Sequence, residues 1–87
     1  MSIKNNRPQN PTEKVLAQYL ASLLEVETVG LDDNLFKLGV DSVLIAMFIN
    51  RVRDEFNVEI PIHTVFQTPT IEALSRTIQD LQRAGSA

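Results

Sequence analysis

Ser42 is the residue whose type and position best suit a chemical role. It follows Asp41, a residue type that caps helices, and it begins a segment with helical periodicity, so its hydroxyl lies in the first turn of a predicted helix. Free backbone N–H groups and the positive end of the helix dipole favour an anion there. The position therefore suits an attached phosphate group. On residue types alone, a second interpretation stays open, in which Ser42 is a capping hydroxyl beside Asp41.

A nucleophilic serine in a hydrolase needs a base, and His63 is the one histidine in the chain. No third orienting residue and no glycine-rich elbow accompany it, so we expect no enzyme activity. His63 is expected at the surface or at its boundary. We also expect no metal site, because cysteine is absent and the stretch Asp32, Asp33 and Asn34 lacks the other ligands of a calcium loop.

The composition indicates one small folded domain. The chain has 87 residues, of which 44% are hydrophobic and 22% charged, which is typical of a globular protein. Its net charge of −3 opposes binding to nucleic acid or to an anionic membrane. The longest apolar run, residues 43–49, is too short to span a bilayer, and the polar start of the chain lacks a signal-peptide core. We therefore expect a cytoplasmic monomer.

The pattern along the chain predicts an all-α fold. Apolar spacing and the sequence Asn10, Pro11 predict a first helix over residues 11–25, and a second helix is predicted over 42–56. Between them lies a long loop with apolar anchors, in which Asp33 could cap a short turn that carries Leu35 and Phe36.

After the second helix, Pro61 and the lack of a partner strand make residues 58–62 an extended loop. A short helical turn is predicted over 63–66, and Thr68 with Pro69 opens a last helix that ends before Gly85. The predicted fold is a small four-helix bundle, with three main helices, one short helix and a long first loop. We expect a flexible N-terminal tail (1–9), a folded domain (10–83) and a C-terminal tail (84–87).

The second predicted helix carries more apolar residues than one core-facing stripe needs. Its stripe consists of Ile45, Phe48, Ile49, Val52 and Phe56. Val43 and Met47 lie instead on the polar side, near Asn50, with Leu44 at the margin. This is either ordinary scattered exposure or a surface that binds a partner protein. We favour the partner surface, because its members follow i, i+4, i+7 spacing beside the helix start.

The chain resembles the acyl and peptidyl carrier proteins. Their signature around a modified serine reads Leu-Gly-x-Asp/His-Ser-Leu, and the likeness extends from about residue 12 to residue 81. It rests on these residues: Phe36; Leu38, Gly39, Val40, Asp41, Ser42 and Val43; Ile49, Asn50, Arg51, Val52, Arg53, Asp54, Glu55 and Phe56; Ile60, Pro61 and Phe66; and Pro69, Thr70, Ile71, Glu72, Ala73 and Leu74. The resemblance implies the same four-helix bundle, so 10–83 is expected to be a carrier domain.

The resemblance implies a covalent cofactor. Ser42 would be esterified with 4′-phosphopantetheine from coenzyme A by a magnesium-dependent phosphopantetheinyl transferase, which Asp41 would also contact. The thiol of this arm would hold acyl or aminoacyl groups as thioesters. Loading enzymes (adenylating enzymes or acyltransferases) and condensing or tailoring enzymes would then meet the carrier at Val43 and Met47. Leu35 and Phe36 would anchor the first loop.

The subtype is indicated by the charge of the second helix and by local segments. Arg51 and Arg53 balance Asp54 and Glu55, whereas carriers of dissociated fatty acid synthesis usually have a strongly acidic second helix. The Arg-Val-Arg-Asp-Glu-Phe and Ile-Pro-Ile segments resemble modular nonribosomal peptide or polyketide synthases, and Asp41 in place of the common His leans toward the polyketide or aryl-carrier side. Val43 departs from the usual Leu.

One alternative belongs to a different class of function. In it the chain is a small helical interaction module that binds a partner through Val43, Leu44 and Met47, and Ser42 serves only as a helix cap. This alternative accounts for the apolar surface without a cofactor. It does not explain why the Gly-Val-Asp-Ser string coincides with that surface.

Overall fold

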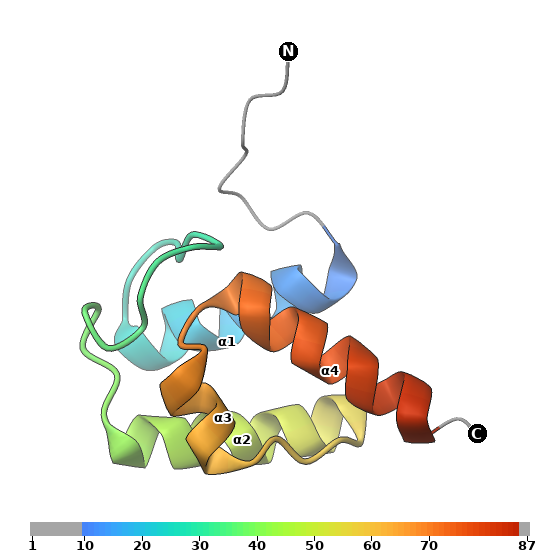
Figure 1. Cartoon of the computed structure of the whole chain (residues 1–87). Helices are drawn as coiled ribbons and strands as arrows, with labels where there is room; N and C mark the ends of the chain where they lie inside the picture. The colour runs from blue at the N-terminus through green and yellow to red at the C-terminus, as the bar shows by residue number, and fades with distance from the viewer. Residues whose placement is uncertain (1–9, 86–87) are drawn as a thin grey trace.

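The chain folds into helices joined by loops. The computed structural model describes residues 10–85, and within them the elements are α1 (Pro11–Leu24), α2 (Ser42–Phe56), α3 (Ile62–Gln67) and α4 (Ile71–Gly85), with no strand (Figure 1). α1 contacts both α4 and α2, and α3 contacts α2. The predicted all-α bundle of three main helices, one short helix and a long first loop is confirmed. The predicted tail 1–9 lies outside the described residues.

α1 begins directly after the predicted capping residue, Asn10. The Glu13 backbone N–H donates to Asn10 Oδ1 over 2.7 Å, and the Asn10 N–H donates back to Glu13 Oε1 over 3.2 Å, which completes a capping box. The helix ends at Leu24, one residue before the predicted end. Glu25 adopts a left-handed conformation, with φ of 57°, and its N–H bonds to the carbonyl groups of the last turn. A glutamate in this role gives no sequence signal, because glycine is the residue that usually marks it.

The core joins the three long helices to the first loop. α2 contributes Ile45, Phe48 and Val52 as fully buried residues, whereas Ile49 and Phe56 of the predicted stripe are half-buried. The other buried apolar side chains come from the remaining helices and from the loops: Leu16, Leu20, Val29, Leu31, Leu35, Val40, Val58, Ile60, Val65, Ile71, Leu74 and Ile78. Four of these belong to the first loop, so that loop is part of the hydrophobic core.

Backbone hydrogen bonds fix the first loop to the start of α4. The Leu35 N–H donates to the Pro69 carbonyl over 2.9 Å, and the Glu72 N–H donates to the Leu31 carbonyl over 3.1 Å. The short turn around residues 35–39 is capped by Asn34, whose Oδ1 accepts from the Phe36 N–H over 2.9 Å.

The prediction that Asp33 caps this turn is wrong. Its carboxylate accepts from the Gly30 N–H over 2.8 Å and so stabilises the preceding turn. Asp and Asn are both good capping residues. Their order in the sequence therefore did not decide which of them caps the turn.

The last two helices differ from their predicted bounds. α3 extends one residue beyond 63–66 at each end, and α4 begins at Ile71 because Thr70 Oγ1 caps it, accepting from the Ala73 N–H over 3.2 Å. α4 also includes Gly85, so the prediction that it ends before Gly85 is wrong. Gly85 does not adopt a positive φ, and the left-handed glycine that usually stops a helix is therefore missing here. Residues 84 and 85 of the predicted C-terminal tail thus belong to the helix.

Ser75 is a buried polar residue in α4 without a visible role. Its side chain is 1% exposed and its Oγ has no hydrogen-bond partner in the described chain. We expect Ser75→Ala to raise the free energy of unfolding by about 1 kcal/mol, because the substitution removes an unsatisfied hydroxyl and improves helix propensity. The melting temperature should rise by roughly 4–8 °C, as measured by circular dichroism. Ser22→Ala, at an exposed helical serine, is the control and should change stability by less than about 0.5 kcal/mol. A loss of stability in Ser75→Ala would show that the hydroxyl has a partner, such as a buried water.

Candidate functional site

A tight turn leads the chain into α2. Gly39 has φ of +107°, a conformation that side-chain-bearing residues rarely adopt, and its N–H donates to the Phe36 carbonyl over 3.2 Å. The next residue, Val40, is buried, and its N–H donates to the Leu35 carbonyl over 3.1 Å. The turn and this anchor together fix where the first residue of α2 lies.

We expect Gly39→Ala to lower the free energy of unfolding by about 1–2 kcal/mol. Its Cβ would meet no atom within 4 Å, so the cost comes from the backbone conformation alone. Gly85→Ala is the matched control, since that position is helical with a negative φ and equally open surroundings, and there alanine should be neutral or stabilising. Urea unfolding of both variants tests this. Equal effects would mean that the turn tolerates a side chain.

Asp41 provides the cap of α2. Its Oδ1 accepts from the Leu44 N–H over 2.9 Å, and its backbone carbonyl accepts from the Ile45 N–H over 2.9 Å. Ser42 is the first residue of the helix, is exposed, and has no hydrogen-bond partner for its hydroxyl in residues 10–85. The interpretation of Ser42 as a helix cap is therefore wrong, because Asp41 alone fills that role. The serine hydroxyl is free to be modified.

The backbone around Ser42 favours a negative charge. The N–H groups of Ser42 and Val43 have no acceptor within the described chain, and they lie at the positive end of a 15-residue helix. A phosphate ester on Ser42 Oγ fits this environment, since the hydroxyl is exposed and the neighbouring donors are unpaired.

His63, at the start of α3, is exposed and has no hydrogen bond to another described residue. Across residues 10–85 no group of three or more His, Asp or Glu side chains is arranged to hold a metal ion. No helix in the same part of the chain is long and apolar enough to cross a membrane.

Apolar side chains are exposed on α2 next to Ser42. Val43 is 65% exposed and Met47 is 46% exposed, and we call these two residues the apolar patch. Leu44 is half-buried and packs against the core. Asn50 is exposed, but its Oδ1 accepts from Arg53 over 2.8 Å, so its side chain already has a partner within the helix.

Three further apolar residues are exposed, and the sequence did not predict their exposure. Leu38 lies in the turn before α2, while Ile62 and Phe66 belong to α3 and are about half exposed. The Phe66 ring stacks on Phe36 with centroids 5.2 Å apart and an angle of 6° between the planes. A helix of six residues is too short to show a periodic pattern, so no sequence signal distinguished the exposed side of α3.

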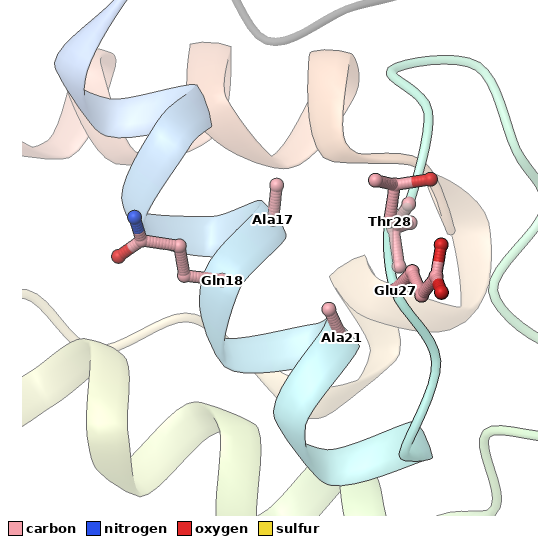
Figure 2. A pocket seen from close by; sticks show the side chains of 6 residues that line it. Ala17, Gln18, Ala21, Glu27 and Thr28 are labelled. Atoms are coloured by element: carbon pink, nitrogen blue, oxygen red, sulfur yellow. The ribbon is translucent and has the colours of Figure 1, made fainter.

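A pocket lies between α1 and the start of the first loop. Figure 2 shows Ala17 and Ala21 of α1 facing the loop residues Glu27 and Thr28, and the pocket holds about 370 Å³. Its remaining lining residues are Gln18 and Val29. None of these residues belongs to α2, so the pocket is separate from Ser42.

Solved structures share this fold. The chain is similar to the peptidyl carrier protein in a structure of the phosphopantetheine transferase Sfp with coenzyme A, with 30% identity, a TM-score of 0.84, and coverage of 87% of this chain and 99% of that one. It is also similar to part of an A-PCP structure of McyG complexed with phenylalanyl-adenylate, with 31% identity, a TM-score of 0.77, and coverage of 82% of this chain and 11% of that one. The fold and the exposed serine together define a carrier domain.

Sequence comparisons identify the family. A family model described as a phosphopantetheine attachment site matches residues 14–78, and the chain belongs to this family. The chain is 40% identical over 76 residues to gramicidin S synthase 2 of Aneurinibacillus migulanus. That match covers 87% of this chain but only 2% of the relative. The cofactor of the family is 4′-phosphopantetheine.

Proposed function

We propose that the chain is a peptidyl carrier domain and that Ser42 Oγ is the attachment point of 4′-phosphopantetheine. The observation that carries this proposal is the free, exposed hydroxyl of Ser42. It is free because Asp41, and not Ser42, caps α2. In the transfer from coenzyme A, the serine oxygen forms a phosphoester bond while the pyrophosphate bond of coenzyme A breaks, and adenosine 3′,5′-bisphosphate leaves. Magnesium and the base that accepts the serine proton belong to the transferase.

The bound arm supplies a thiol that the chain itself lacks. The sequence contains no cysteine, so a thioester would form on the arm alone. The residues of the chain hold the arm at one end: the turn at Gly39 and the cap at Asp41 fix Ser42, and the unpaired N–H groups of Ser42 and Val43 favour the phosphate. The carrier is therefore a substrate of enzymes and performs no catalysis itself.

The proposed cargo is an aminoacyl or peptidyl group. Similarity to a gramicidin synthase supports the peptide type over the polyketide type, and the balanced charge of α2 is compatible with it. The proposed partners are a phosphopantetheinyl transferase, an adenylating enzyme that loads the arm, and condensing or tailoring enzymes that use the cargo. We propose that Val43, Leu44 and Met47 contact these partners, and that Asn50 lies at the edge of the contact.

The proposal includes a monomeric state and a cytoplasmic location. The large apolar side chains exposed in residues 10–85 are Val26, Leu38, Val43, Met47, Ile62 and Phe66, which are fewer than the roughly 20–30 residues a side of a stable interface. Cytoplasmic coenzyme A would be the donor of the arm. Sedimentation equilibrium of the loaded chain tests the monomer, and a concentration-dependent rise in mass would contradict it.

The test of the cargo class uses the chain after loading. It is incubated with ATP, an amino acid and excised adenylation domains of peptide synthetases, and in parallel with malonyl coenzyme A and acyltransferases. We expect a hydroxylamine-labile aminoacyl group in the first reaction and none when Ser42 is alanine. Charging by acyltransferases alone would place the chain in the polyketide type instead.

A further inference from the structure

A narrow groove runs between α1 and α2 on the exposed side of the bundle. It holds about 220 Å³ and is lined by Tyr19, Ser22 and Leu23 from α1 and by Met47 and Arg51 from α2. Met47 is also a member of the apolar patch, so the groove is continuous with the surface next to Ser42. Along the axis of α2, Met47 lies about 7.5 Å from Ser42 and Arg51 about 13.5 Å from it.

The charges beside this groove are arranged by Tyr19. The guanidinium of Arg51 lies over the Tyr19 ring, with its central carbon 4.8 Å from the ring centroid. The Tyr19 hydroxyl donates to Glu55 Oε1 over 2.9 Å. Burial together with this hydrogen bond raises the pKa of Tyr19 above its ordinary value, which already keeps the phenol protonated at neutral pH. Arg51 itself has no carboxylate within 4.0 Å anywhere in residues 10–85.

The second arginine of α2, Arg53, is already paired with other residues of the chain. Arg53 forms an ion pair with Glu59 at 3.2 Å and donates to Asn50 over 2.8 Å. The two arginines therefore differ, although their residue type and helix are the same. Arg53 is neutralised within the chain, whereas the guanidinium of Arg51 lies over the Tyr19 ring and has no ion pair in residues 10–85.

These features fit a protein side chain better than a small molecule. The volume of the groove is below the 300–1,000 Å³ that is usual for ligand pockets. Tyr19, Leu23 and Met47 give it apolar walls, and the planar fork of Arg51 matches the geometry of a carboxylate. Charge complementarity thus indicates an occupant with an apolar side chain next to an acidic one.

We propose that the groove between α1 and α2 is a docking site for an acidic segment of the adenylating enzyme that charges the arm on Ser42. In this arrangement the enzyme places an apolar side chain against Tyr19, Leu23 and Met47, and a neighbouring Asp or Glu pairs with Arg51. This inference rests on the proposed carrier function. It adds a contact that would help the enzyme to select this carrier. The contact lies on the side of α2 that faces α1, beyond the apolar patch.

The test compares charge reversals at the two arginines in the loaded chain. The probe is an excised adenylation domain chosen because it aminoacylates the wild-type loaded chain. We expect Arg51→Glu to raise the KM for the carrier about tenfold with little change in kcat, because a rim charge mainly affects association. Arg53→Glu introduces the same charge two residues further along α2 and should stay within about twofold of wild type.

A second pair of variants tests the groove without changing its charge. Ser22→Phe fills the groove from α1 and should raise the KM as Arg51→Glu does, whereas Gln18→Phe, which lies outside this groove on the same helix, should not. A carboxylate-to-lysine change in the adenylation domain should restore normal KM with Arg51→Glu. Wild-type KM values in both Arg51→Glu and Ser22→Phe would overturn the proposal.

Loading by Sfp separates this proposal from the carrier function. Arg51→Glu should still gain one phosphopantetheine, as shown by intact mass, and should melt within a few degrees of wild type. A wild-type chain that Sfp does not load would mean that the carrier function fails, and the groove would then lose its basis as well.

Discussion

We expect Ser42→Ala to abolish loading with phosphopantetheine and to leave the chain folded. The oxygen that would form the phosphoester is removed, so we expect no gain in intact mass after incubation with coenzyme A, magnesium and Sfp. The stability should change by less than about 0.5 kcal/mol, because the hydroxyl is exposed and makes no hydrogen bond to residues 10–85. Circular dichroism and urea unfolding verify that the variant is native.

Ser22→Ala is the matched control for this experiment, since Ser22 is an exposed helical serine outside the first turn of α2. It should load as completely as wild type. Loading of Ser42→Ala at the wild-type rate would show that another hydroxyl accepts the group. That result would contradict the proposal that Ser42 is the attachment point.

We expect Met47→Glu to weaken the interaction with partner enzymes without unfolding the chain. Its side chain is 46% exposed, so a carboxylate there stays hydrated in the free carrier but must lose water in the complex. Replacing an apolar contact side chain in an interface costs roughly 1.4–2.8 kcal/mol, which corresponds to a ten- to hundredfold rise in KM. Aminoacylation kinetics of the loaded chain measure this, and Val43→Glu should act in the same direction.

The control for this effect adds the same charge at a distant surface. Ala84→Glu places a carboxylate near the end of α4, which Figure 1 shows on the opposite side from the start of α2. It should leave the KM unchanged. If Ala84→Glu and Met47→Glu weaken charging equally, the effect comes from net charge and the apolar patch is not a contact surface.

The sequence was most informative where local signals were strong. α2 has its predicted bounds because Asp41 caps it and its apolar residues recur with a helical period. The bounds were less accurate where tertiary contacts or weak caps decide them. Glu25 ends α1 in a left-handed conformation without being glycine, and Gly85 continues α4 although glycine commonly stops a helix.

The part of the site that local sequence signals define could be predicted. The position of Ser42 at the start of a helix followed from its neighbours, but its freedom from capping required the hydrogen bond between Asp41 and Leu44 to be seen. The groove had no sequence signal. Its charges are arranged by the contact of Tyr19 with Glu55, two residues that lie 36 positions apart and meet only when α1 packs against α2.

The carrier function of Ser42 is tested most directly by a peptide map of the wild-type chain after incubation with coenzyme A, magnesium and Sfp. We expect a gain of one phosphopantetheine per chain, located by fragmentation on Ser42. A folded chain that gains no mass, or a group that maps to a residue outside the start of α2, would contradict this function.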